Sequence, residues 1–96
     1  MKAKRIYLTC MADAICAFMD AGVEMYLPDG DEDRGLMPSD TGIDAWVGDD
    51  GRVHVRWLYD GKMHSIPRAV CASLGRAGYR IFGGVWLVRV VRAEVE

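Results

Sequence analysis

The residues best suited to chemistry stand together in the segment LPDGDEDRGLMPSD, residues 27–40. Asp29, Asp31 and Asp33 alternate there, and Asp40 is the twelfth residue counted from Asp29. Alternating carboxylates followed by an acidic residue at position twelve are the ligand pattern of an EF-hand calcium loop. A calcium-binding loop at residues 29–40 is therefore the first hypothesis.

Several features of the same segment depart from the calcium pattern. Position six, where the EF-hand requires glycine, is Arg34, and Gly35 comes one residue late. Asp40 is shorter than the usual bidentate Glu, and Pro38 stands where a helix should begin. We keep calcium as an alternative and expect neither a metal nor another cofactor. A solvated loop or a partner-binding surface fits the segment better.

The negative charge of the chain is concentrated in one quarter of its length. Residues 28–50 contain eight acidic residues and one arginine, a balance of −7, whereas the other residues have a balance of +5. Such asymmetry bears on partners rather than on the fold. We predict a partner-binding surface formed by Asp29, Asp31, Glu32, Asp33, Asp40, Asp44, Asp49 and Asp50, together with Trp46 and Arg56.

The histidines and cysteines are not expected to form a metal or catalytic site. His54 and His64 fall on opposite faces of the predicted sheet, and Cys10 and Cys16 lie about 240° apart around a helix. Cys71 falls on an apolar helix stripe, where we expect a buried thiol. The chain also lacks a G-x-S-x-G elbow and a glycine-rich phosphate loop. We therefore expect no enzyme.

Length and composition predict a single domain spanning residues 1–96. Of the 96 residues, 51% are hydrophobic and 27% are charged, as in ordinary globular proteins. No apolar run reaches the ~20 residues that cross a bilayer. Asp13 interrupts the apolar N-terminal stretch, so we expect no signal peptide. Three cysteines then indicate reduced thiols and a cytoplasmic location without membrane contact.

The N-terminal half is predicted to contain a helix, a strand and the acidic loop. Apolar residues at three- and four-residue spacing predict a helix over residues 5–21, which ends at Gly22. The start is ambiguous, because RIYLT (5–9) has strand propensity and could form a short edge strand. Residues 23–27 are predicted to form a strand that ends at Pro28, and the loop follows at about 28–42.

Residues 43–67 predict a three-stranded antiparallel meander. GDDG (48–51) suits a three-residue hairpin loop, and Asp60-Gly61 suits a two-residue turn. Both turns place Val53, Val55 and Trp57 on one face. The opposite face carries Trp46, His54, Arg56, Leu58 and Met63, with Asp44 opposite Arg56. A tryptophan there requires cover from the same chain or from a partner, which includes a second copy in a homodimer.

The C-terminal part predicts a second helix and one or two strands. Pro67 begins the helix and Gly78 ends it. Residues 85–92 are apolar on both faces and are expected to form a central strand, while Gly83-Gly84 forms a hairpin turn or a bulge. The predicted class is α+β: an antiparallel sheet of about four to six strands with two helices packed on one face, in the order α-β-β-β-β-α-β(-β).

Nucleic-acid binding by helix 67–77 and the hairpin after it is an alternative function. Its charge would come from Arg68, Arg76, Arg80, Arg89 and Arg92. The acidic net charge and the absence of a dense basic cluster count against it. A helix-turn-helix also needs a helix just before the recognition helix, where this chain has a hairpin. We therefore place direct nucleic-acid binding behind protein binding.

The preferred interpretation is a small non-enzymatic protein-interaction module. In size, concentrated acidity and lack of catalytic motifs, the chain is similar to phage-encoded inhibitors, among them anti-CRISPR proteins. Some of these inhibitors present carboxylates to the Lys and Arg residues that hold phosphates in a nucleic-acid machine. The similarity implies a basic, nucleic-acid-handling protein partner and assigns no residue.

Overall fold

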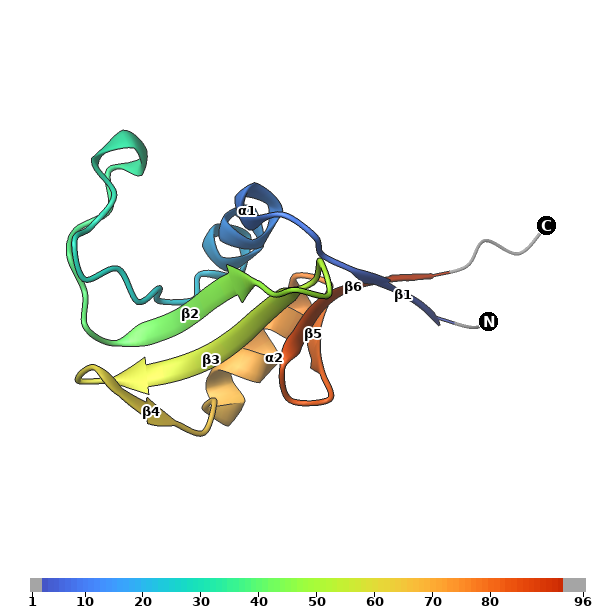
Figure 1. The fold of residues 1–96 in the computed structure, drawn as a ribbon. Coiled ribbons are helices and arrows are strands. Elements are labelled where there is room, and N and C mark those ends of the chain that lie inside the picture. Colours follow the sequence, from blue (N-terminus) through green and yellow to red (C-terminus); the bar gives the residue numbers. More distant parts are fainter. Residues whose placement is uncertain (1–2, 93–96) are drawn as a thin grey trace.

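An antiparallel sheet with two helices on one of its faces makes up the computed structural model, which describes residues 3–92 (Figure 1). The elements are β1 (Ala3–Tyr7), α1 (Met11–Ala21), the 3-10 turn η1 (Glu32–Arg34), β2 (Gly42–Val47), β3 (Val53–Tyr59), β4 (Lys62–His64), α2 (Arg68–Arg76), β5 (Tyr79–Phe82) and β6 (Trp86–Arg92). The predicted α+β class is confirmed, with one strand more at the N-terminus and one fewer before β2.

The N-terminal segment resolves the ambiguity over residues 5–9. It forms β1, which pairs antiparallel with β6, and α1 begins only at Met11. The prediction of a helix from residue 5 is therefore wrong, and the edge-strand alternative is correct. The physical reason is tertiary: β6 offers an unpaired edge, and β1 satisfies its backbone groups. The helix ends as predicted at Gly22, which adopts φ of 68°.

Residues 23–27 do not form the predicted strand. They make two isolated bridges, one between Met25 and Ile43 and one between Leu27 and Ser39. The chain passes very close to the start of β2, since a Cβ added to Gly42 would lie 2.6 Å from the carbonyl oxygen of Glu24. The two segments run parallel there, joined by 2.8 Å hydrogen bonds from the Tyr26 N–H to Ile43 and from the Ile43 N–H to Glu24.

The meander of β2, β3 and β4 has the predicted register in both hairpins. β4 ends at His64, opposite Trp57, so the third strand of the meander is shorter than the predicted stretch to residue 67 and does not reach Val55. The backbone N–H of Val55 donates instead to the carbonyl oxygen of Val85 at 2.8 Å. The β5–β6 hairpin thus occupies the edge of β3 that a longer β4 would have taken.

β6 is the central strand, as its apolar sequence predicts. Val88 lies opposite both Tyr7 and Arg80, and Trp86 lies opposite both His54 and Phe82. β5 therefore pairs along one edge of β6, while β1 and β3 share the other edge. The glycine pair at 83–84 forms the hairpin turn between β5 and β6, and the alternative of a bulge is excluded.

The hydrophobic core lies between the sheet and the two helices. Val53, Val55 and Trp57 of β3 face it as predicted, with Phe18 from α1 and Leu74 from α2. Leu74 is the single buried residue of α2, so that helix contacts the core along a narrow strip.

Cys71 lies outside this strip and is exposed, so the predicted burial of its thiol is wrong. No helix in the described part of the chain is long and apolar enough to span a membrane.

Candidate interaction surfaces

Residues 28–41 form a narrow arm that projects from the body at the N-terminal end of β2 (Figure 1). Two pairs of backbone hydrogen bonds close this acidic arm. Leu27 and Ser39 exchange bonds of 3.0 and 2.7 Å, and Asp31 and Leu36 exchange bonds of 2.9 and 2.8 Å. The η1 turn forms the tip. The segment predicted as a loop is therefore an ordered projection.

The base of the acidic arm is attached to the turn between β3 and β4. The backbone N–H of Gly61 donates to the carbonyl oxygen of Asp40 at 2.8 Å, and that of Asp60 donates to Oγ1 of Thr41 at 3.1 Å. The Ser39 hydroxyl lies 3.1 Å from the carboxylate of Glu24. These contacts hold the arm in one direction relative to the sheet.

One of the five carboxylates in the acidic arm is neutralised within it. The Nη1 atom of Arg34 lies 2.7 Å from Oδ2 of Asp31, and this hydrogen bond is the main reason that the pKa of Asp31 is lowered. The other four carboxylates are exposed and have no ion pair among the residues that the structure describes; they belong to Asp29, Glu32, Asp33 and Asp40. The arm has a net charge of −4.

The carboxylates of the arm are arranged as an exposed surface and not as the ligands of a metal site. Asp31, a central ligand of the calcium hypothesis, is held by Arg34. Within residues 3–92, no three His, Cys, Asp or Glu residues are grouped so that they could hold a metal ion. The negative charge of the arm is therefore open to solvent and to a partner.

The predicted acidic surface is divided by the length of β2. The acidic arm precedes this strand, whereas Asp49 and Asp50 lie in the turn that follows it (Figure 1). Asp44 lies within the strand, where its Oδ2 accepts a 2.8 Å hydrogen bond from Nε of Arg56. The predicted residues thus form an arm, a cross-strand ion pair and a turn.

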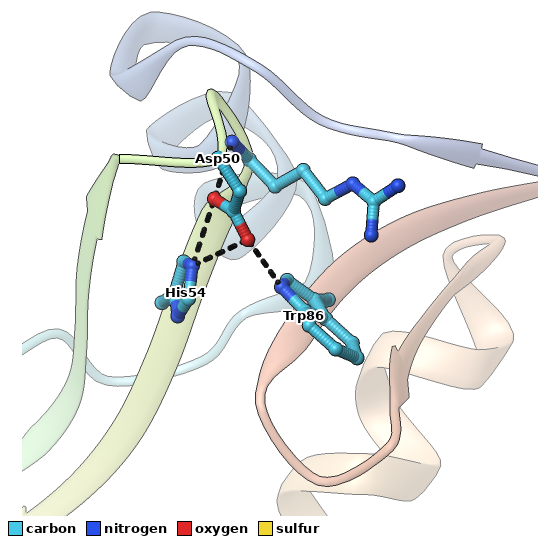
Figure 2. Close-up of polar contacts among 4 residues, drawn as sticks. Asp50, His54 and Trp86 are labelled. Carbon is cyan, nitrogen blue, oxygen red and sulfur yellow. Dashed lines mark hydrogen bonds and ion pairs between the residues drawn. The ribbon is translucent and has the colours of Figure 1, made fainter. Parts of the chain in front are cut away.

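Asp50 is engaged within the molecule by three donors (Figure 2). Nε2 of His54 lies 3.0 and 3.1 Å from its two oxygens, the indole N–H of Trp86 donates at 3.0 Å, and the backbone N–H of Arg52 donates at 3.0 Å. A carboxylate only accepts, so His54 carries a proton on Nε2. The Arg52 N–H and then His54 lower the pKa of Asp50 to about 2.

A row of aromatic side chains crosses the face of the sheet opposite the helices. Trp46 lies opposite His54, His54 opposite Trp86, and Trp86 opposite Phe82, so four strands contribute one ring each. Residues directly opposite in antiparallel strands share a face. Trp46 and His54 stack with ring centroids 5.5 Å apart, and Tyr7 meets Trp86 and Phe82 edge-on at 6.2 and 6.4 Å. These five residues are the aromatic row.

Three arginines lie over rings of the aromatic row. The guanidinium carbon of Arg52 is 3.9 Å from the ring centre of Tyr7, and that of Arg5 is 4.2 Å from the ring centre of Phe82. Arg56 lies 5.3 Å from the ring centre of Trp46. Such cation–π contacts order both partners. His54 and Arg56 cover only part of the outer tryptophan, because Trp46 remains 41% exposed.

Sequence reasoning found only part of this face. Trp46, His54 and Arg56 were placed on it by the two meander turns, but Trp86 and Phe82 were not. A signal for them was present: a hairpin turn at Gly83-Gly84 with a three-residue loop sets Phe82 opposite Trp86. A bulge at the same two glycines also fits the sequence, so the sequence alone does not decide this register.

The arginines of the predicted nucleic-acid element do not gather in one place. Arg68 and Arg76 are exposed on α2, on the helix-covered side of the sheet. Arg80 lies opposite Val88 on the outer face. Arg89 follows Val88 in β6, so it lies on the other face, where it lines a cleft beside α1. The side chain of Arg92 lies outside the described residues.

The cleft beside α1 has a volume of about 330 Å³ and carries reactive types of side chain. Its lining includes Thr9, Asp13, Cys16, Tyr79 and Arg89. Within the described chain, none of these five side chains is hydrogen-bonded to another. A nucleophile paired with a base, as covalent catalysis requires, is therefore not assembled there.

Comparisons of the chain with known protein families, curated proteins and solved structures find no match. The acidic arm and the outer sheet face are therefore the two features of the structure that bear on function.

Proposed function

We propose that this protein is a small, non-enzymatic protein-interaction module that binds a basic surface of a nucleic-acid-handling protein through its acidic arm. One observation carries the proposal. Four exposed carboxylates stand on an ordered projection whose single cation, Arg34, is already paired with Asp31.

The shape of the arm suits insertion into a basic groove. A projection brings its carboxylates to a partner without contact between the two protein bodies, and its internal hydrogen bonds reduce the entropy lost on binding. Met37 is 80% exposed beside the carboxylates and can supply a flexible apolar contact. Lys and Arg residues that hold phosphates are the expected ligands of the arm, so binding would exclude nucleic acid and inhibit the partner, as phage-type inhibitors do.

The test compares two charge-neutralised variants in capture of partners from a host lysate. The arm variant carries Asp29→Asn, Glu32→Gln, Asp33→Asn and Asp40→Asn. The control variant carries Asp13→Asn, Asp20→Asn, Glu94→Gln and Glu96→Gln, which change the net charge equally outside the arm and outside the predicted partner-binding set. We expect the wild-type and control proteins to capture the same partner, which the arm variant loses and added nucleic acid displaces.

Two results would contradict the proposal. In the first, the arm variant captures the partner as well as the control variant does. In the second, an excess of nucleic acid leaves the complex intact, which means that the partner is not held by its phosphate-binding residues.

A further inference from the structure

We infer a second binding surface, independent of the acidic arm: the aromatic row and its arginines bind single-stranded nucleic acid. This second function goes beyond the proposed one: the outer face is positively charged, whereas the acidic arm is negatively charged. It rests on the juxtaposition of five rings and four arginines on the sheet face that the helices leave uncovered (Figure 1).

The charge of this face favours a polyanion. Arg5, Arg52, Arg56 and Arg80 belong to it, against the carboxylates of Asp44 and Asp50. Both carboxylates are engaged by donors of the same face, Asp44 by Arg56 and Asp50 by the donors of Figure 2. The net charge of +2 on the face contrasts with −4 on the arm. Arginine side chains in such a setting donate to phosphate oxygens.

The rings favour a ligand with flat groups. Trp46 is 41% exposed at one end of the row, and the guanidinium planes of Arg5 and Arg52 cover Phe82 and Tyr7. Unpaired bases stack on aromatic rings and on guanidinium planes, while the backbone follows neighbouring positive charges. Four strands about 4.8 Å apart give the row a width of about 14 Å, enough for more than one base.

The same geometry argues against a duplex and against an acidic peptide. The bases of a duplex are already paired and stacked on one another, whereas unpaired bases can lie flat on exposed rings and guanidinium groups. An acidic peptide would use the arginines but would leave the rings without stacking partners. A single strand satisfies both sets of side chains.

Fluorescence anisotropy of labelled oligothymidylate and oligouridylate of about 12 nucleotides tests the inference, at about 50 mM salt. The two oligonucleotides distinguish DNA from RNA. We expect Trp46→Ala, and separately Arg5→Gln with Arg56→Gln, to raise Kd about tenfold or more. The matched control, Arg68→Gln with Arg76→Gln on α2, removes equal charge and should change Kd by less than about twofold.

The inference is overturned by any of three outcomes. In the first, neither oligonucleotide binds at about 0.1 mM protein, which is the weak end of non-specific affinities. In the second, the α2 control variant weakens binding as much as the outer-face variants do. In the third, a duplex of equal length or polyglutamate competes as well as the unlabelled single strand does. Thermal melts check that each variant is folded, and if Trp46→Ala is not folded, the result for the arginine pair decides. The arm-neutralised variant should retain oligonucleotide binding, so this test and that of the proposed function fail separately.

Discussion

Asp50 is held by three donors at the point where β3 meets β6 on the outer sheet face. Its carboxylate joins His54 of β3 to Trp86 of β6, at the one position where these two strands pair directly (Figure 2). The backbone N–H of Arg52 fixes the carboxylate from the third side. The sequence assigns Asp50 to the partner-binding set, which stays a prediction: these donors hold its side chain, which is 36% exposed.

The thermal stability of the protein should depend on pH through the ionisation of Asp50. The pKa of Asp50 falls from its ordinary value of 3.8 to about 2 on folding. The ionised carboxylate therefore stabilises the folded state, and the protonated form does not. Its contribution is complete above about pH 5 and is lost as pH falls through about 4 toward 2. Asp50→Asn should therefore lower Tm near neutral pH and converge with the wild type in acid, as followed by circular dichroism. A difference in Tm that stays constant from about pH 7 to 2 would contradict this role.

Some elements of the fold can be predicted from local sequence, and others depend on contacts between distant segments. The meander was predictable because GDDG and Asp60-Gly61 fix hairpin register by local backbone chemistry. Residues 5–9 satisfy a helix period and a strand propensity at once, and only pairing with β6 decides between them. Cys71 was misplaced because helical periodicity does not reveal how narrow a contact α2 makes with the core. The aromatic row needed the pairing of β3 with β6, which no local signal encodes.

The close approach of Glu24 and Met25 to Gly42, at the start of β2, predicts that even one added methyl group will destabilise the fold. In Gly42→Ala, the new Cβ would lie 2.6 Å from backbone atoms of Glu24 and Met25, at a φ of 143° that favours glycine. We expect a loss of about 3 kcal/mol in the free energy of unfolding, measured in urea. Gly75→Ala in α2 is the control, because its Cβ meets nothing within 4 Å and helix propensity favours alanine. Equal free energies of unfolding for the two variants would show that Gly42 is not packed closely against Glu24 and Met25.

The acidic arm should behave as a separate unit of low local stability. Its η1 tip contains no buried residue, and hydrogen bonds rather than core packing hold it together. Amide hydrogen exchange at Asp31 and Leu36 should therefore be much faster than at Val55, which lies in the core strand β3. Arm amides as protected as those of β3 would mean that the arm is part of the core cooperative unit.

At the scale of the whole molecule, the fold separates two surfaces of opposite charge. The molecule is elongated, with extents of 47 × 28 × 28 Å, and the acidic arm leaves the sheet beside the β3–β4 turn (Figure 1). The aromatic row runs from β2 across the sheet to β5, with Tyr7 of β1 beside it. The low net charge of the chain hides this division. The sequence shows no dense basic cluster, and direct nucleic-acid binding is therefore placed behind protein binding, because the arginines of the outer face come from three separate strands and the turn before one of them.

The most direct test of the central claim, that the arm carboxylates bind the partner, is the rate of association with the captured partner as ionic strength increases. Screening shortens the range of exposed charges to ~10 Å at 0.1 M salt, so steering by the arm should weaken with salt. We predict that the wild-type rate falls about tenfold or more between low and high salt, while the arm variant is slow and almost insensitive to salt. Equal rates for the two proteins at every salt concentration would contradict the account.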